Sequence, residues 1–208
     1  MLAEEPADVV IARNDPAPAV IEEFIPDTMP VVAPPPVATE LSANAFIVAR
    51  GASGRDAVYE KNTRIQLSPA SLTKLMTAVI VTEYIDNNDS VIITARAVNA
   101  EGVAGSLRAD ETFSVADLLK VMLVVSSNDA ATAFEDHFAS QGLDLVSLMN
   151  EKAKLLGMVN THFVNPTGLD DPNHYASAAD LAVLAAYSLR HEELWDILSK
   201  TSEGVRSL

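Results

Sequence analysis

The sequence of 208 residues contains no cysteine. Disulfide bonds and thiolate metal sites are therefore excluded, and the composition is compatible with an oxidising compartment. Histidine is scarce, and no two histidines have the four-residue spacing of a helical metal-binding pair. We expect surface or local hydrogen-bonding roles, and not metal ligation, for His137, His162, His174 and His191.

Positive charge is also in short supply. There are 14 lysines and arginines against 29 acidic residues, which gives a net charge of −15. A groove for nucleic acid needs a basic stripe, so nucleic acid is not expected as a partner. The sequence has no apolar run of about 18 residues that would predict a membrane span. Its first residues lack the positive and apolar regions of a secretory signal.

Proline and acidic residues are abundant near the start of the sequence. Residues 1–42 hold eight of the eleven prolines, eight acidic residues and a single basic residue, Arg13. Such a composition favours extended polyproline conformation over a packed core. We predict a disordered, acidic, proline-rich arm at 1–42, with a wrongly chosen start site as the alternative. A folded domain should occupy residues 43–208.

The pattern of apolar and turn-forming residues in 43–208 predicts a mixed α/β (α+β) domain. Residues 45–49 and 57–60 flank a glycine-containing turn and predict a β-hairpin. A short strand is expected at 91–94. Tyr84 and Trp195 are expected in or near the core. Helices are predicted at about 70–86, 114–125, 129–139, 143–156 and 178–190, and Ser114 and Ser177 have the pattern of N-caps.

The segment Ser71-Leu72-Thr73-Lys74 carries the strongest chemical signal. Residues three apart are neighbours on a helix, so the Ser71 hydroxyl and the Lys74 amine should lie side by side. That is the layout of an acyl-transfer nucleophile and its base, provided that burial and a nearby cation lower the lysine pKa. The alternative is a surface helix with an exposed lysine. The predicted buried face of this helix consists of Leu72, Leu75, Met76, Val79 and Ile80.

A second signal is Ser126-Ser127-Asn128, at the point where one predicted helix gives way to the next. The Ser126 hydroxyl could relay a proton, and the Asn128 carboxamide could hold a substrate amide. Ser-x-Asn is a weak pattern, because Ser42-Ala43-Asn44 matches it too. The alternative is an ordinary cap for the helix that begins near Asp129.

Together these motifs resemble those of a known family. Residues 68–78 are similar to the active-serine motif of the D-alanyl-D-alanine carboxypeptidases, the low-molecular-mass penicillin-binding proteins of serine peptidase family S11. Ser126 to Ala130 are similar to the family's second motif. Two further stretches, 163–169 and 174–182, are similar to the loop and helix that follow it. The resemblance extends from about Asn44 to Leu198.

The resemblance implies a β-lactamase/transpeptidase-like fold, in which a helical cluster packs against an antiparallel sheet that is incomplete in this chain. It implies that Ser71 is the acylated nucleophile, Lys74 its base, Ser126 a proton shuttle and Asn128 the residue that orients the substrate amide. The implied substrate is a peptidoglycan stem peptide ending in D-Ala-D-Ala, and β-lactams would be trapped at the same serine. It implies no metal or organic cofactor, and a periplasmic or extracytoplasmic location.

One family motif is missing. The family has Lys-Thr-Gly on a strand beside the serine, whereas Lys200-Thr201-Ser202 lacks the glycine and follows a helical pattern. We do not place Lys200 in the site. Without the cation that anchors a substrate carboxylate and the strand's oxyanion donor, the chain is expected to be inactive or impaired. A C-terminally truncated form of a longer enzyme is the expected explanation, with a signal segment missing as well.

Two other functions remain open at this point. A serine β-lactamase shares Ser-x-x-Lys and an asparagine-bearing second motif, but a class A enzyme also needs a glutamate that activates water. No convincing motif for one lies between Asn128 and Asp180. The other is a non-catalytic protein that binds peptidoglycan.

Overall fold

The computed structural model describes residues 41–51, 53–200, 205, 207 and 208. Residues 42–208 belong to one unit. The predicted arm lies outside the described residues except for Leu41 and Ser42, and it stays a prediction. Within the described residues, no helix has both the length and the apolar character that crossing a bilayer would need.

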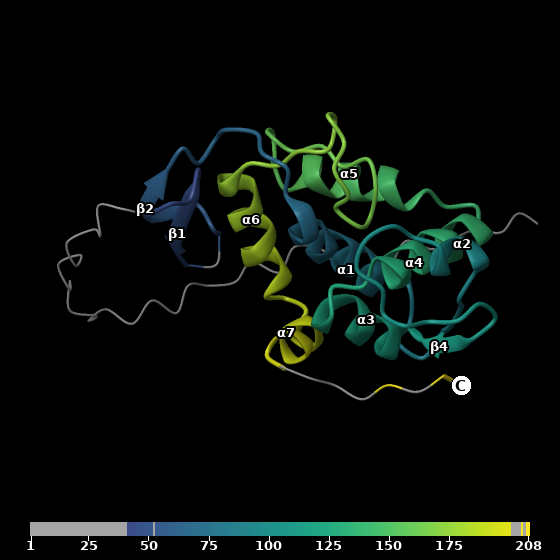
Figure 1. Cartoon of the computed structure of the whole chain (residues 1–208). Helices are drawn as coiled ribbons and strands as arrows, with labels where there is room; N and C mark the ends of the chain where they lie inside the picture. Colours follow the sequence, from purple (N-terminus) through teal and green to yellow (C-terminus); the bar gives the residue numbers. More distant parts are fainter. Residues whose placement is uncertain (1–40, 52, 201–204, 206) are drawn as a thin grey trace, which may run out of the picture. The chain divides into compact units, whose positions relative to one another are not determined.

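The first two strands form the predicted hairpin. β1 (Phe46–Arg50) and β2 (Asp56–Lys61) pair antiparallel, with a register irregularity between Val48 and Ala49. The hairpin lies beside α6 (Ala178–Ser188), as both ribbon views show (Figure 1). Gly54 in the connecting turn sits so close to the Ala182 carbonyl of α6 that a Cβ would overlap it. The turn therefore requires glycine for a close backbone approach.

A second small sheet lies among the helices. β3 (Ser90–Ile92) pairs antiparallel with β4 (Thr112–Ser114), so that Val91 faces Phe113. The short helix α2 (Ala95–Val98) follows β3, and Thr94 caps it. The strand expected at 91–94 is confirmed with bounds shifted by one or two residues. Neither β4 nor α2 was predicted, because three or four residues are too few to show a period.

The longer helices follow the prediction closely, and side-chain oxygens cap four of them. Ser114, Ser127, Asp144 and Ser177 each accept a hydrogen bond from a backbone N–H in the first turn of the helix they precede. The predicted helix at 70–86 begins as a 3-10 turn, η1 (Ala70–Leu72). The helices are α1 (Thr73–Tyr84), α3 (Val115–Val124), α4 (Asn128–Ser140), α5 (Leu145–Leu155), α6 and α7 (Glu192–Leu198).

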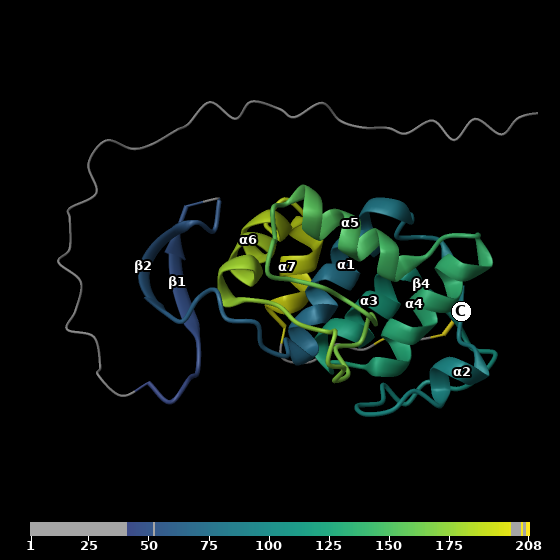
Figure 2. The ribbon, with the colours of Figure 1, turned by 90° about the horizontal axis from the view of Figure 1, so that it is seen from above.

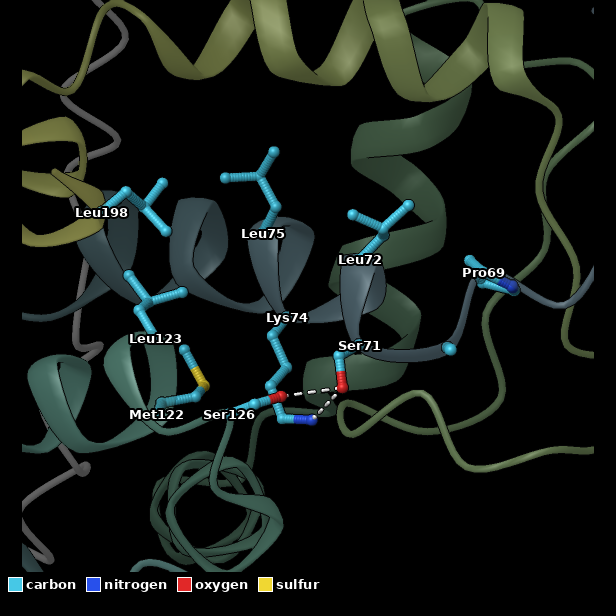
Figure 3. Close-up of a pocket in the computed structure, with 10 residues that line it drawn as sticks. Pro69, Ser71, Leu72, Lys74, Leu75, Met122, Leu123, Ser126 and Leu198 are labelled. Carbon is cyan, nitrogen blue, oxygen red and sulfur yellow. Dashed lines mark hydrogen bonds between the residues drawn. The ribbon is translucent and has the colours of Figure 1, made fainter. Parts of the chain in front are cut away.

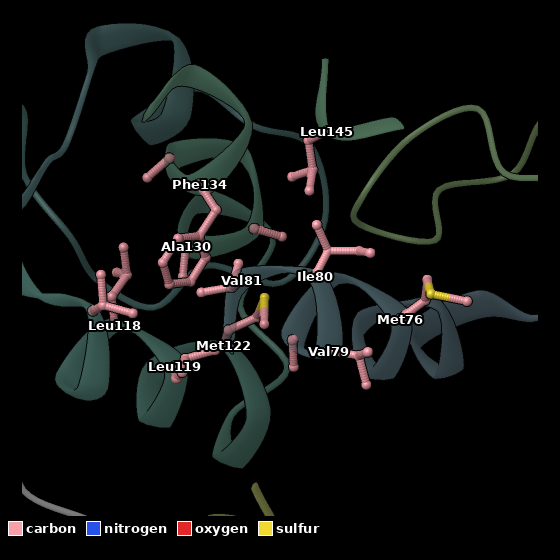
Figure 4. Packing of buried hydrophobic residues seen from close by; sticks show 14 of the residues in the cluster. Met76, Val79, Ile80, Val81, Leu118, Leu119, Met122, Ala130, Phe134 and Leu145 are labelled. Carbon is pink, nitrogen blue, oxygen red and sulfur yellow. The ribbon is translucent and has the colours of Figure 1, made fainter. Parts of the chain in front are cut away.

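Helix α1 runs through the middle of the helical cluster and packs against α3, α4, α5 and α6 (Figure 2). Its apolar side chains meet those of α3 and α4 in a continuous core (Figure 4). The expected face is only partly buried, because Leu72 is 60% exposed while Met76, Val79 and Ile80 are inaccessible. Tyr84 and Trp195 are 50% and 37% exposed, so neither lies in the core, although the Tyr84 ring lies near it, 6.2 Å from that of the buried Phe138. The core includes Val81, Leu118, Leu119, Met122, Phe134 and Leu145.

Candidate active site

Ser71 sits in the 3-10 turn that leads into α1. The preceding residue, Ala70, has φ of +47°, a left-handed conformation that costs free energy for an L-residue. Ser71 is exposed, so its hydroxyl is open to solvent and to a reactant. Its backbone lies at the N-terminal end of α1, where the helix dipole favours negative charge.

Lys74 is buried directly beside that hydroxyl. The side chain is 2% exposed, and its Nζ lies 3.3 Å from Ser71 Oγ (Figure 3). Burial lowers the pKa of Lys74 from 10.5 to about 8. A lysine with this pKa is neutral in about one molecule in ten at pH 7, against fewer than one in a thousand when exposed. The exposed-lysine alternative is therefore wrong.

The other partners of Lys74 determine how a neutral amine would point. Nζ lies 2.7 Å from Asn128 Oδ1 and 2.7 Å from the Thr167 carbonyl oxygen. Both oxygens only accept hydrogen bonds, and a neutral amine has two N–H groups and one lone pair. When both N–H groups are donated to these acceptors, the lone pair is left for the third neighbour, the Ser71 hydroxyl. This is the orientation that a base needs in order to remove the serine proton.

Ser126 lies in the connection between α3 and α4, and Asn128 is the first residue of α4. Ser126 has φ of +60°, and its hydroxyl lies 2.8 Å from Ser71 Oγ. The N-cap of α4 is Ser127, so capping does not occupy the Ser126 hydroxyl. Asn128 donates from Nδ2 to the Glu101 carbonyl at 2.7 Å, and this bond fixes the orientation of its amide. The structure thus brings together all four side chains singled out in the sequence.

Sequence reasoning missed the backbone group that completes the surroundings of Lys74. The Thr167 carbonyl belongs to a tight turn in which Asn165 Oδ1 accepts hydrogen bonds from the backbone N–H groups of Thr167 and Gly168. Gly168 has φ of +86°, and a Cβ there would overlap the Ala70 carbonyl. The turn chemistry of Asn165-Pro166-Thr167-Gly168 was the available signal, but a carbonyl's direction cannot be seen in sequence.

A pocket of about 550 Å³ opens beside Ser71. Its walls are mostly apolar and come from η1, α1, α3 and α7, whereas its polar side chains are those of Ser71, Lys74 and Ser126 (Figure 3). Lys200 is exposed beyond the end of α7 and is not among the described residues that line the pocket. In the part of the chain that the structure describes, no group of three or more His, Asp and Glu side chains is placed to bind a metal ion. The apolar lining consists of Pro69, Ala70, Leu72, Leu75, Met122, Leu123 and Leu198.

Comparison with known proteins agrees with this geometry. A family model described as D-alanyl-D-alanine carboxypeptidase, peptidase family S11, matches residues 30–206. The chain is 37% identical over 142 residues to D-alanyl-D-alanine carboxypeptidase DacF of Bacillus subtilis, a match that covers 66% of this chain and 36% of that protein. It is also 37% identical over 158 residues to D-alanyl-D-alanine carboxypeptidase DacC of Escherichia coli, covering 71% of this chain and 39% of the relative.

Solved structures give the same result for the fold. The D-alanyl-D-alanine carboxypeptidase DacD from Francisella tularensis superposes with a TM-score of 0.73 and 30% identity, covering 87% of this chain and 46% of its own. Penicillin-binding protein 5 from Haemophilus influenzae superposes with a TM-score of 0.71 and 33% identity, covering 81% and 50%. The expected penicillin-binding/β-lactamase-like fold is thereby confirmed. The chain spans less than half the length of the curated relatives described above, and about half of these solved chains.

Proposed function

The chain belongs to the S11 family of serine peptidases, the D-alanyl-D-alanine carboxypeptidases, and from this premise we propose that Ser71 is its acylated nucleophile. The observation that carries the proposal is the buried Lys74 amine, 3.3 Å from Ser71 Oγ and held by two acceptors on its other sides. The proposed substrate is a peptidoglycan stem peptide that ends in D-Ala-D-Ala. The proposed place of action is outside the cytoplasm, where that polymer lies.

In the acylation step, Ser71 Oγ attacks the carbonyl carbon of the penultimate D-alanine while its proton passes to the neutral Lys74 Nζ. The backbone N–H of Ser71, at the start of the helical segment, stabilises the oxyanion that develops. The C–N bond then breaks, and the terminal D-alanine leaves as an amine after receiving a proton. Ser126 lies 2.8 Å from Ser71 Oγ and can relay that proton to the leaving nitrogen.

In deacylation, water is the nucleophile and Ser71 is the leaving group. Water attacks the acyl ester of Ser71, neutral Lys74 takes a proton from the water, and Ser71 leaves as a hydroxyl after regaining a proton. Asn128 supports both steps by holding one N–H of the amine, and its Nδ2 has a second hydrogen for a substrate carbonyl. A β-lactam ring would acylate Ser71 in the same way. Its ring-opened leaving group stays attached, which slows the attack of water.

We also propose that the 208-residue chain reacts slowly when it is studied by itself. Its sequence contains no Lys-Thr-Gly. In the family resemblance, that strand provides the cation for the substrate carboxylate and the second oxyanion donor. Losing one oxyanion donor costs about 10²–10³ in rate in other enzymes, so a comparable deficit is expected here.

The test is labelling with a fluorescent penicillin at pH 8, followed by intact-mass measurement of the adduct. We expect slow labelling of the native chain that is abolished in Ser71→Ala and retained in Ser68→Ala. Labelling that persists in Ser71→Ala would refute the nucleophile. Rapid turnover of a chromogenic cephalosporin without a stable adduct would favour a β-lactamase. Binding to peptidoglycan without any acylation would favour the non-catalytic alternative.

A further inference from the structure

The segment Phe163–His174 is attached to helix α1 at several points close to the nucleophile. The Lys74 amine donates to the Thr167 carbonyl, and the Thr77 hydroxyl donates to the Pro166 carbonyl at 2.8 Å. At the end of the segment, His174 Nε2 lies 2.8 Å from Thr73 Oγ1. The partners on α1 are one and three residues apart, so the segment follows the face of the helix that bears the catalytic amine.

His174 is a buried residue with a single possible hydrogen-bonding state. Its side chain is 2% exposed, and burial lowers its pKa, which favours the neutral imidazole. The backbone N–H of Val164 points at His174 Nδ1 at 3.2 Å, so Nδ1 must be the acceptor. The proton is therefore on Nε2, which donates to Thr73 Oγ1. The ring also packs edge-on against Phe163, with their centroids 5.7 Å apart.

These two hydrogen bonds connect the first residue of α1 to the start of the Phe163–His174 segment. Thr73 precedes Lys74 and follows the Ser71-Leu72 turn, whereas Val164 is three residues before the carbonyl that accepts from Lys74. Thr73, at one end of this bridge, is fully buried, and Val164, at the other end, is partly buried. Thr167, whose carbonyl accepts from Lys74, is 5% exposed. A displacement of His174 would therefore also displace the Thr167 carbonyl, which accepts from Lys74.

The same segment also supports the backbone beside the nucleophile. Gly168 packs against the Ala70 carbonyl, where the chain is in its left-handed conformation. Asn165 holds Thr167 and Gly168 in a fixed turn through its Oδ1. The segment is therefore rigid between its contact with Ala70 and its contact with Lys74. Its placement relative to α1 is set by the Thr77 contact and by His174.

We propose that His174 is a positioning residue for the reaction: its imidazole holds the Phe163–His174 segment against α1, so that the Thr167 carbonyl keeps Lys74 dry and directs its lone pair at Ser71. This inference rests on the proposed role of Ser71 and Lys74. His174 is not among the described residues that line the pocket, and its ring nitrogens face Thr73 and Val164 instead of Ser71 or Lys74. It acts through Thr73 and Val164.

Two substitutions separate the hydrogen bonds from the packing of the ring. His174→Phe keeps the ring volume and the contact with Phe163 but removes both hydrogen bonds. His174→Gln retains one acceptor and one donor and serves as the conservative rescue. His162→Phe is the matched control, because His162 is exposed and its Nδ1 lies 2.7 Å from the Asn173 carbonyl oxygen. Its ring packs against Tyr175, a contact that phenylalanine can keep.

The first measurement is the pKa of Lys74 from the ¹³C shift of its Cε in NMR titrations of the folded protein. We expect a value near 8 in the native chain, in His174→Gln and in His162→Phe. In His174→Phe, water reaches the amine, so its pKa should rise by at least about one unit towards that of an exposed lysine. Such a rise lowers the neutral fraction at pH 7 about tenfold.

The second measurement is the rate of labelling by a fluorescent penicillin at pH 7. It should fall about tenfold in His174→Phe, recover in His174→Gln and stay unchanged in His162→Phe. An unchanged Lys74 pKa and labelling rate in His174→Phe would overturn the inference. An equal loss in folded His174→Gln would also overturn it, because that variant retains a donor and an acceptor.

Two further outcomes are distinguishable. If His174→Phe does not fold, Thr73→Val removes the same bridge from the helix side, and the expected pKa and rate changes are the same. If the native chain and Ser71→Ala are labelled equally, the proposed function fails. The Lys74 titration still decides whether His174 controls the surroundings of the amine.

Discussion

Both the oxygen and the nitrogen of the Asn128 side-chain amide form hydrogen bonds within the protein. Nδ2 faces the Glu101 carbonyl and Oδ1 faces the Lys74 amine, so its orientation follows from its two partners. A neutral acceptor is what a lysine base requires. Such an acceptor can take a hydrogen bond from the neutral amine and from the ammonium ion alike. It carries no full negative charge, which would favour the ammonium ion.

Asn128→Asp tests this directly, because it changes charge with almost no change in shape. The new carboxylate should raise the pKa of Lys74 above 8 and would oppose the Glu101 carbonyl without an N–H between them. We expect labelling by a fluorescent penicillin at pH 7 to fall at least about tenfold, since each pKa unit is a factor of ten. Asn99→Asp is the control, because exposed Asn99 also donates to a backbone carbonyl, that of Ala95. A normal rate in Asn128→Asp would contradict this account of the amide.

The pH dependence of acylation should report the same amine. In the proposed mechanism the reactive form of Lys74 is the deprotonated one, and burial lowers the pKa of Lys74 to about 8. The acylation rate should therefore rise about tenfold per pH unit below that value and level off above it. Stopped-flow or quenched labelling between pH 6 and 10 measures the profile. A rate independent of pH across this range would exclude Lys74 as the base.

At the scale of elements, the turn at Gly168 determines where η1 can lie. Gly168→Ala combines a left-handed conformation with overlap of the Ala70 carbonyl. Gly142→Ala, in the connection between α4 and α5, has a similar φ of +75° but no neighbouring atom in contact. We expect Gly142→Ala to cost about 1 kcal/mol of unfolding free energy, and Gly168→Ala at least about 2 kcal/mol more. Urea unfolding measures both, and equal losses would contradict the close approach.

The far end of α1 is held by a cluster of charged and polar side chains. Glu83 lies 2.6 Å from Lys152 of α5 and accepts from the Tyr187 hydroxyl of α6 at 2.6 Å. Although burial alone would raise the pKa of Glu83, the His191 ring nitrogen 3.5 Å from its carboxylate, the contacts from Lys152 and Tyr187 and the charge of Lys152 lower it to about 2. The carboxylate is thus favoured in the folded state, and the cluster links three helices.

The lowered pKa of Glu83 predicts how the stability of the fold changes with pH. The folded-state pKa of Glu83 is below its ordinary value of 4.5, so its contribution is fully present above pH 5 and is lost as the pH falls towards 2. It amounts to at most about 3 kcal/mol. Urea unfolding of the native chain and Glu83→Gln at pH 7, 5, 4 and 3 should show a difference that shrinks with acid. A constant difference would contradict the linkage.

Much of the secondary structure could be predicted from sequence, for identifiable reasons. The helices from α3 to α6 have side-chain caps such as Ser114 and Ser177 and enough length to display a period. The burial of Leu72 was wrongly predicted, because periodicity shows which side chains share a face but not what covers it. In the site, Ser71, Lys74, Ser126 and Asn128 could be found because their chemistry is in their side chains. The Thr167 and Glu101 carbonyls could not, since every residue has one.

At the scale of the whole molecule, the elements differ in how much packing holds them. Helix α1 is surrounded by other helices, and its central residues Met76 to Val81 are inaccessible. The β1–β2 hairpin contacts α6 and exposes Val48 and Val58. Two-stranded hairpins are marginal without further packing. The hairpin should therefore open without global unfolding.

Native-state hydrogen exchange can measure this difference. Amides of β1 and β2 should exchange at least about 10²-fold faster than those of α1 and α3, because local opening costs less free energy than global unfolding. The protection of α1 should track the global unfolding free energy as urea is added, and that of the hairpin should not. Equal protection of the hairpin and α1 would show that the unit opens only as a whole.

The groups around Ser71 come from three separate stretches of chain: η1 with α1, the α3–α4 connection and the turn at Thr167. None of these stretches can make the hydroxyl reactive alone, because in an unfolded chain Ser71 is an ordinary alcohol and Lys74 an ordinary ammonium ion. Under the proposed mechanism, the reactivity of Ser71 is therefore acquired only on folding. Under the same mechanism, the fraction of molecules that a β-lactam labels would measure the fraction that is correctly folded.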